Sequence, residues 1–580
     1  EFSSDYNVTY YISEDGPTLV QQNVALTNRE TNLYATESEI TIGTSNVNNV
    51  SASDGGGNLA LKVSHDQDRT KIHVYFNQKV VGKGKTLNWS LRYQTNEVVT
   101  KTGLVKEVNV PRLELDPNIS SYNLSLVVPR SWGKPAYIKP VYKDVLTFNK
   151  DELSQGQISI AFGQFQIFDF RLTYHLKNPR LTPILTEIAL PPDTNYQKVY
   201  LKTLQPQPVN VEVDKDGNWL AKYNLKPQEG LHILATGSAQ LFLAPQKEQA
   251  GFRTSQYLAP QKYWEVNSPE IQKLAAKYKT PKEIYRYVVN TLKYNYQKVQ
   301  ENPVRLGALA VLKQPDAAIC MEFTDLFIAI ARAAGFPARE VDGFAFTTNE
   351  RLRPLSLKKD ILHAWPEYFD GEKWIQVDPT WQNTTGGVDF FQTFDFNHFA
   401  FVIKGTDSEY PYPAGSYKLD GQDTKDVDVI PSEVEIIPQQ NKINLDLAVM
   451  PQAIAGFGIT GQLVITNLSP NVISDQKVSL KASGASLSSS HSSTGLIPPY
   501  GKKEIIFNLS KIPWYQKTPI LLSAMVGKNT VDKVIRVKPI ILLYLLPVIL
   551  VLIIIGIAIV LIFKKKAKTP NDNSQELHTK

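Results

Sequence analysis

Residues 317–339 read AAICMEFTDLFIAIARAAGFPAR and contain the only cysteine of the 580-residue chain. Apolar residues recur at the spacing of one helix face until Gly335 and Pro337 end the pattern. Cys320 therefore stands at the start of a predicted helix. Unpaired backbone N–H groups and the helix dipole favour an anion there, which suits a thiolate nucleophile. A buried structural cysteine could occupy the same position, since free cysteines are often buried.

A thiolate nucleophile needs a histidine to carry the proton and a third group to orient that histidine. Of eight histidines, His363 is distinguished by its segment, ILHAWPEYFDGEKWIQVDPTW at 361–381. Asp370-Gly371 is typical of a two-residue hairpin turn, which would place His363 directly opposite Asp378 with Cβ atoms ~5 Å apart. A four-residue loop would instead pair His363 with position 380. Alternatively, the two residues form an exposed cross-strand polar pair. We expect the other histidines to be structural, with His398 fixing a turn.

These segments resemble the core of the transglutaminase-like superfamily of papain-related thiol enzymes. The resemblance rests on the cysteine helix, HAWPEYF at 363–369 and KWIQVDPTW at 373–381, and it covers about 255–410. It implies that Cys320 is the nucleophile, His363 the general base and acid, and Asp378 the orienting carboxylate. YNY at 294–296 also fits the family pattern. Family members usually carry glycine two residues before the cysteine, where this chain has Ala318.

Three classes of function stay open. A transglutaminase-like thiol acyltransferase would form a thioester on a protein or peptide amide and pass it to an amine. A cysteine peptidase or amidase would pass the same thioester to water. A catalytically weak envelope scaffold or binding protein is the third possibility. We predict no cofactor, because no metal-ligand cluster is visible in the sequence.

The remaining segments predict a multidomain chain with β-structure on both sides of the α+β catalytic core. Short alternating runs such as LNWSLRYQ predict a β-sandwich over 1–175 and a β-rich connecting region over 176–254. Helix-start signals at Ser268 and Thr280 place the catalytic domain at 255–410. A turn-rich linker over 411–438 would lead to an immunoglobulin-like sandwich over 439–538.

One segment predicts a membrane helix. Residues 540–563 are 24 apolar residues without a charge, enough to cross a ~30 Å hydrocarbon core. We predict a transmembrane helix at 539–563 and, because KKKAK follows it, a cytoplasmic tail at 564–580. The catalytic domain would then be extracellular on a bacterial cell membrane, with a signal peptide missing from this sequence. The alternative is a cytosolic enzyme with a tail anchor.

The composition of the chain limits the classes of binding partner that we expect. The net charge of +6 is small for this length, and part of it comes from the lysines after the apolar segment, so it gives no case for nucleic-acid binding. A single cysteine cannot form an internal disulfide, so the fold depends on its apolar cores. The expected partners are a protein or peptide substrate and the membrane.

Overall fold

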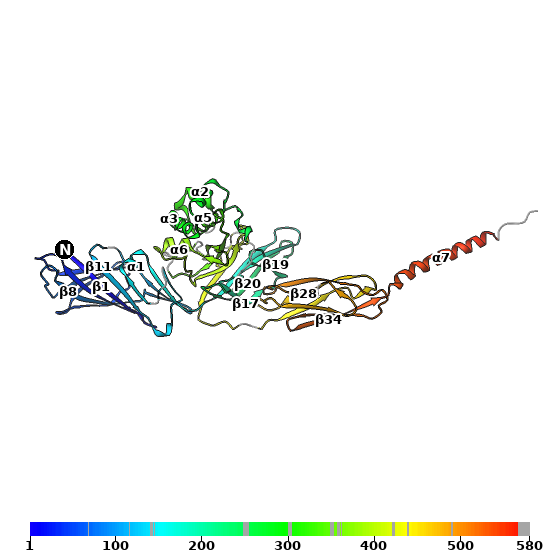
Figure 1. The fold of residues 1–580 in the computed structure, drawn as a ribbon, viewed down its shortest axis with the longest axis horizontal. Helices are drawn as coiled ribbons and strands as arrows, with labels where there is room; N and C mark the ends of the chain where they lie inside the picture. Colours follow the sequence, from blue (N-terminus) through cyan, green and yellow to red (C-terminus); the bar gives the residue numbers. More distant parts are fainter. Residues whose placement is uncertain are drawn as a thin grey trace, which may run out of the picture. The chain divides into compact units, whose positions relative to one another are not determined.

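The computed structural model describes residues 1–67, 69–114, 116–139, 143, 145–246, 254–299, 304–348, 353–355, 360, 362–419, 421, 424–437, 440–488 and 491–566. The chain forms two compact units, Glu1–Pro438 and Gln439–Lys580. Short helices gather in the middle of the first unit, a long helix ends the second, and strands make up most of the rest (Figure 1). Many β-sheets around one mixed core agree with the sequence analysis.

Residues 2–162 build three sheets around one apolar core. The largest has the order β13-β11-β1-β2-β8-β4-β5, and the others have the orders β12-β14-β10-β9 and β3-β7-β6. Alternation explains the core, because every second residue of β8 is buried, including Trp89 and Leu91. The elements are β1 (Phe2–Tyr11), β2 (Thr18–Asn28), β3 (Glu37–Ile42), β4 (Asn48–Asp54), β5 (Gly57–Asn58), β6 (Ala60–His65), β7 (Thr70–Tyr75), β8 (Thr86–Thr95), β9 (Val99–Thr102), β10 (Val105–Val110), β11 (Ile119–Val127), η1 (Arg130–Trp132), β12 (Tyr137–Lys139), β13 (Thr147–Asn149), α1 (Lys150–Gln155) and β14 (Ile158–Phe162).

Two further sheets follow, with the orders β17-β20-β15-β25 and β16-β19-β18. Their strands are β15 (Gln166–Lys177), β16 (Ile184–Leu190), β17 (Gln197–Gln205), β18 (Asn210–Val213), β19 (Trp219–Leu225), β20 (Gly230–Leu241) and β25 (Val427–Ser432). Strand β25 lies inside the predicted linker 411–438, part of which is therefore a sheet strand. It pairs antiparallel with β15 and buries Val427 and Val429, an alternation that turn-forming residues around it concealed in the sequence.

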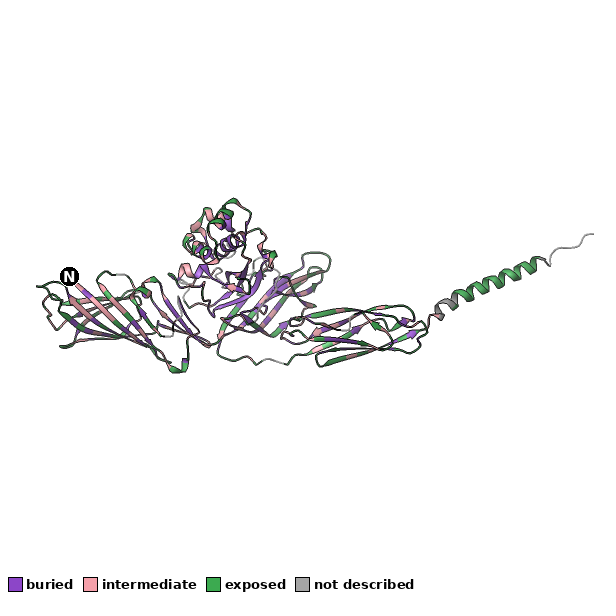
Figure 2. Cartoon of the chain, in the orientation of Figure 1, coloured by how far each residue is buried: buried purple, intermediate pink, exposed green. Residues whose placement is uncertain are grey.

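The helical part surrounds α5, which is buried along most of its length (Figure 2). It packs with α2, α3 and α4 on a four-stranded sheet of order β23-β22-β21-β24. Ser268 and Thr280 cap α2 and α3 through their side chains, as the sequence predicts. The elements are η2 (Ser255–Leu258), α2 (Pro269–Lys277), α3 (Pro281–Thr291), α4 (Ala308–Lys313), η3 (Pro315–Ala317), α5 (Cys320–Ala333), β21 (Ala338–Ala345), β22 (Leu362–Phe369), β23 (Trp374–Gln376), α6 (Pro379–Thr384) and β24 (His398–Lys404).

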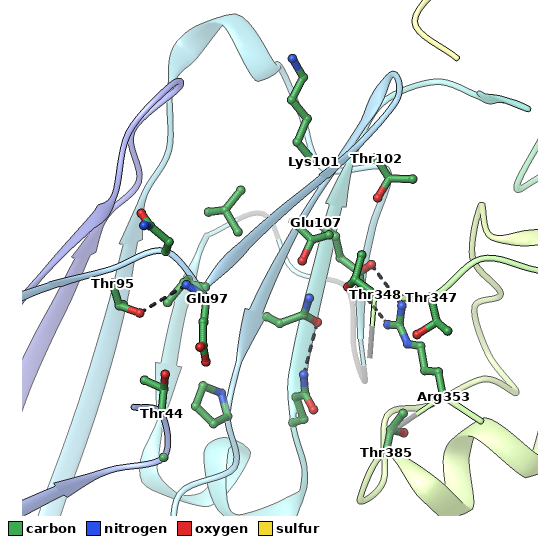
Figure 3. A pocket seen from close by; sticks show the side chains of 18 of the residues that line it. Thr44, Thr95, Glu97, Lys101, Thr102, Glu107, Thr347, Thr348, Arg353 and Thr385 are labelled. Carbon is green, nitrogen blue, oxygen red and sulfur yellow. Dashed lines mark hydrogen bonds and ion pairs between the residues drawn. The ribbon is translucent and has the colours of Figure 1, made fainter. Parts of the chain in front are cut away.

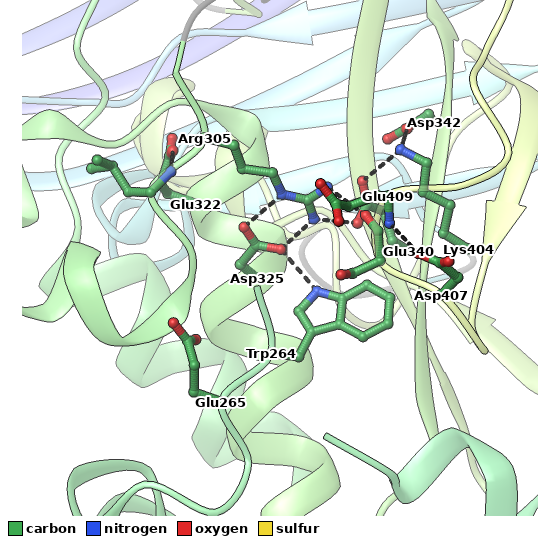
Figure 4. Close-up of polar contacts among 12 residues, drawn as sticks. Trp264, Glu265, Arg305, Glu322, Asp325, Glu340, Asp342, Lys404, Asp407 and Glu409 are labelled. Atoms are coloured by element: carbon green, nitrogen blue, oxygen red, sulfur yellow. Dashed lines mark hydrogen bonds and ion pairs between the residues drawn. The ribbon is translucent and has the colours of Figure 1, made fainter. Parts of the chain in front are cut away.

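A buried ionic network ties α5 to the sheet (Figure 4). Arg305 binds Asp325 of α5 and Glu340 of β21. Asp325 also accepts a hydrogen bond from the indole of Trp264 at 2.8 Å, and Lys404 of β24 lies 3.7 Å from Glu340. Since these carboxylates are almost fully buried, their charges depend on the two cations.

The second unit contains two sheets, of orders β26-β28-β32-β30 and β27-β34-β33-β29-β31, around an apolar core. The immunoglobulin-like assignment of 439–538 remains a prediction. The strands are β26 (Ile443–Ala448), β27 (Gln452–Ile454), β28 (Ile459–Asn467), β29 (Lys477–Ala482), β30 (Ser486–Leu487), β31 (His491–Ser493), β32 (Lys502–Ser510), β33 (Ile520–Val526) and β34 (Asn529–Lys538).

The last element is the helix α7 (Ile541–Lys566), which follows β34 after two residues. Its segment Pro547–Lys565 is long and apolar enough to cross a membrane and has no buried part (Figure 2). Of the predicted tail 564–580, residues 567–580 lie outside the described residues.

Candidate active site

Cys320 is the first residue of α5, at the helix start that the sequence predicts, and its side chain is 0% exposed. Glu322 fixes the turn around it. The carboxylate accepts hydrogen bonds from the backbone N–H of Ile319 at 2.9 Å and of Leu306 at 2.9 Å, and it pairs with Lys298 at 3.0 Å. The segment that enters the helix is thus anchored on both sides of the thiol.

Ala318 stands where glycine was expected from the family resemblance. Its backbone is extended, with φ −84° and ψ 139°, so no left-handed conformation is needed. Its carbonyl accepts a hydrogen bond from the N–H of Asn295 at 2.8 Å. The neighbouring Tyr294 forms a β-bridge with Ala318, which places the YNY segment against the entry to α5. Alanine therefore fits this position without backbone strain.

His363 and Asp378 meet as predicted, although the predicted hairpin register is wrong. The observed pairs are Glu367 with Gln376 and Phe369 with Trp374, so the loop has four residues. The side chain of Asp370 accepts from the N–H groups of the second and third residues after it, at 2.9 and 2.8 Å, and folds this longer loop.

Asp378 lies beyond the end of β23, as the N-cap of α6. One carboxylate oxygen accepts hydrogen bonds from the N–H groups of Thr380 and Trp381, at 2.9 and 3.0 Å. The other oxygen lies 2.9 Å from Nε2 of His363. Capping, rather than strand pairing, therefore orients the carboxylate toward the imidazole.

Electrostatics favours an ion pair between the two side chains. Burial alone would lower the pKa of His363, but the charge and hydrogen bond of Asp378, together with the Cys320 thiol, raise that pKa to about 9. Burial alone would raise the pKa of Asp378, yet His363 and His398 hold the pKa of this carboxyl well below its usual value. The imidazolium and the carboxylate are thus both charged at neutral pH.

Nδ1 of His363 points away from Asp378. It is buried and has no hydrogen-bond partner among the residues that the structure describes. The Cys320 side chain lies close enough to this imidazole to contribute to its raised pKa. The indole ring of Trp381 stacks on the imidazole, with ring centroids 5.2 Å apart. Nδ1 is therefore the atom available to exchange a proton with the thiol.

His398 is the residue that the sequence analysis missed. It opens β24, and its Nε2 lies 3.3 Å from the same Asp378 oxygen that contacts His363. Its Nδ1 lies 2.7 Å from Asp395. Two carboxylates can only accept hydrogen bonds, so both ring nitrogens carry protons, and the two carboxylates raise the pKa of His398 against the effect of burial. The Asp-x-x-His spacing of 395–398 was the available signal.

His363, Asp378 and His398 offer ligand atoms that lie within 4.8 Å of one another, a spacing that a metal ion could use. Two of the distances, 2.9 and 3.3 Å, are those of hydrogen bonds. Since the Asp378 oxygen already accepts from both imidazoles, the hydrogen-bonded network accounts for all three side chains.

A cavity of about 740 Å³ lies between the N-terminal sheets and the part of the chain that carries β21, α6 and β24 (Figure 3). Thr385 and Asn397, next to α6 and β24, line one side of it, and Thr95 and Thr102 line the other. The buried pair Arg353–Glu107, 2.8 Å apart, joins the two sides. The labelled side chains bear hydroxyl groups or charges, whereas Val98, Phe346 and Val388 add apolar surface, so the lining is mixed.

Comparison with known proteins gave a match to one family model. Residues 267–379 match the model of the Transglutaminase-like superfamily, so the central part of the chain is similar to the core of that family. The match contains Cys320, His363 and Asp378. The comparison with curated proteins gave no match.

Three bacterial structures are similar to the chain. A candidate cysteine protease from Cytophaga hutchinsonii has 16% identity and a TM-score of 0.32, over 48% of this chain and 94% of that one. The periplasmic domain of TgpA from Pseudomonas aeruginosa, bound to ethylmercury, has 15% identity and a TM-score of 0.21, over 38% and 91%. A candidate protease from Parabacteroides distasonis has 12% identity and a TM-score of 0.16, over 87% and 93%.

Proposed function

We propose that the chain is a cell-surface, membrane-anchored thiol enzyme that acts on protein or peptide amide bonds through Cys320, His363 and Asp378. One observation carries the proposal. A buried imidazole, held at Nε2 by a carboxylate at 2.9 Å, keeps Nδ1 unpartnered within the described residues beside a thiol at a helix start. This arrangement suits a thiolate–imidazolium pair.

The reaction follows from that pair. The Cys320 thiolate attacks the amide carbonyl, and the C–N bond breaks as His363 gives its Nδ1 proton to the leaving nitrogen. The products are a thioester and ammonia or an amine. An incoming amine or water then loses a proton to His363, attacks the thioester and returns the thiolate. Asp378 keeps Nε2 protonated and stabilises the imidazolium throughout.

The oxyanion needs hydrogen-bond donors. The backbone N–H of Cys320 is one, because the first N–H groups of a helix have no partner within the helix. The hydroxyl of Tyr294 is the second in this proposal. This hydroxyl is buried and has no hydrogen-bond partner among the described residues. Burial raises the pKa of Tyr294, and the nearby charge of Cys320 raises it further.

Transfer and hydrolysis differ only in what resolves the thioester. A glutamine-containing protein incubated with a labelled amine separates them. Incorporated label supports the acyltransferase, whereas released ammonia or cleaved chain without label supports the amidase or the peptidase. Cys320→Ala is the control that removes the nucleophile from either reaction. If wild type and this variant give equal signals in all three assays, the chain is a scaffold or binding protein instead.

A further inference from the structure

The end of the second unit that leads into α7 exposes aromatic side chains. All eight tryptophans lie within the described residues, and seven are buried in apolar cores. Trp514 is the exception, with 66% of its surface exposed, and Tyr515 beside it is 68% exposed. Phe457, on a neighbouring loop, is 50% exposed. Large apolar side chains that are exposed together on a protein surface usually mark a site of interaction with a partner or a membrane.

These residues lie where the chain enters the apolar helix. Strand β27 pairs with β34 so that Ile454 faces Lys538, and the two residues Pro539 and Ile540 then lead into α7. The N–H of Gly456 donates to the carbonyl of Ile512 at 3.0 Å. A Cβ placed on Gly456 would lie 3.4 Å from Ile540 and 3.7 Å from Trp514. The aromatic loops and the root of α7 are thus direct neighbours.

The charge of this end is uniform. The segments 454–458, 483–485, 511–519 and 538–540 contain three basic residues, Lys511, Lys517 and Lys538, and no Asp or Glu. All three lysines are exposed. Trp and Tyr gather at the level of lipid headgroups, and neighbouring lysines attract anionic lipids.

We infer that the loops bearing Phe457, Trp514 and Tyr515 insert into the headgroup region of the membrane, so that the C-terminal β unit docks on an anionic lipid surface. This inference rests on the membrane span proposed for α7. The aromatic rings provide the apolar contact, and the three lysines provide attraction to lipid phosphates. Docking of this end would limit the motion of the unit on its two-residue connection to the helix.

A fluorescent probe tests the insertion in the full chain, reconstituted into vesicles that contain anionic phosphatidylglycerol. In a Cys320→Ser background, the added cysteine is the only thiol. An environment-sensitive nitrobenzoxadiazole label on Trp514→Cys should show a blue-shifted emission. Lipids that carry a quencher near the headgroup should remove most of that emission.

The chain offers matched controls. Leu468 is 55% exposed and follows the far end of β28, about 30 Å from its start, so a label on Leu468→Cys should emit as in water and resist quenching. A label on Ile555→Cys reports the helix itself. Blue-shifted emission at 555 with water-like emission at 514 overturns this inference alone, whereas water-like emission at 555 overturns the membrane span.

The lysines add a second measurement. Replacing Lys511, Lys517 and Lys538 by Gln should reduce the quenching at 514 in vesicles containing phosphatidylglycerol, and added salt should reproduce this loss in the unmodified lysine background. In neutral phosphatidylcholine vesicles the two proteins should give the same quenching. Equal quenching of both proteins in the anionic vesicles would overturn the assignment to an anionic surface.

Discussion

At the scale of residues, the candidate site is held together by Asp378, whose carboxylate caps α6 and lies 2.9 Å from Nε2 of His363. Cys320 was recognisable because helix periodicity defines α5 from its first turn onward, and Gly335 and Pro337 mark its end. The partnership of His363 with Asp378 was predicted from a two-residue turn that does not form. The pair meets because Asp378 caps α6, an interaction between a side chain and a helix that strand pairing does not describe. His398 escaped notice because its contact with Asp378, 20 residues earlier in the chain, has no local sequence signal.

Replacing Asp378 by Asn tests the orienting role. Asn still caps a helix but carries no charge, so the fold should persist while turnover falls by roughly 10⁴-fold, the order seen when a triad carboxylate is neutralised. Measured kcat for the amide substrate, with circular dichroism as the check on folding, decides this. Near-normal turnover would remove Asp378 from the mechanism.

The same variant has a signature in the pH dependence of stability. The pKa of His363 rises from 6.5 to about 9 on folding, so its ion pair contributes fully below pH 6.5 and is lost as pH rises through about 9. The lowered pKa of Asp378 makes the contribution vanish again as pH falls below 3.8. The stability difference between wild type and Asp378→Asn should therefore be largest between these limits and narrow above pH 9. A constant difference would contradict the ion pair.

His398 should act as a positioning residue. As an imidazolium between Asp378 and Asp395, it partly neutralises the negative charge of the Asp378 carboxylate, which holds His363. Trp365, Trp381 and Phe394 pack around its ring, and Lys139 and Arg353 act on Asp395 from the far side.

His398→Gln keeps a hydrogen-bond donor for Asp378 but removes the positive charge. The carboxylate then attracts the His363 proton more strongly, so the pKa of His363 should rise. The alkaline limb of the kcat/KM profile should move to higher pH in this variant. His491→Gln, on β31 of the other unit, is the control. A loss of rate without any shift of the limb would assign His398 a structural role only.

At the scale of elements, the sequence predicted α5 and the starts of α2 and α3 well, because capping and periodicity are local signals. It did not predict why charged residues point inward from α5. Asp325 is buried together with Arg305 and Glu340, which come from a loop and from β21, and no local pattern links these three positions. Strand β25 was missed for the same reason, since its partner β15 lies more than 250 residues earlier.

Arg305→Met should destabilise the helical core around α5. It leaves two carboxylates buried beside each other, at a cost of about 3–5 kcal/mol typical of a broken buried ion pair. The free energy of unfolding in urea measures the loss of stability. Hydrogen exchange of the α5 and β21 amides shows whether the loss is local to the network. Lys262→Met is the matched control, because the pair Lys262–Glu409 is exposed and its loss should leave exchange in α5 unchanged. Equal effects of the two substitutions would contradict a structural role for the buried network.

At the scale of the whole molecule, composition and periodicity predicted a chain rich in β-structure with one helical core and one apolar helix. They did not predict that β25 returns to the sheet of β15, which makes the residues up to Pro438 one compact unit. Such a closure depends on contacts between distant segments, and periodicity carries no information about them.

The proposed orientation of α7 has a direct test in whole cells. The segment Pro547–Lys565 can span a bilayer, and the lysines at 564–566 favour the cytoplasmic side for the end that follows it. Protease added to intact cells or spheroplasts should therefore digest the portion before about residue 535 and leave a small fragment that carries KKKAK. Detergent-permeabilised cells provide the control in which this fragment is accessible as well. Protection of the large portion in intact cells would instead place the catalytic core in the cytosol, with α7 as a tail anchor, and would restrict its protein substrates to that compartment.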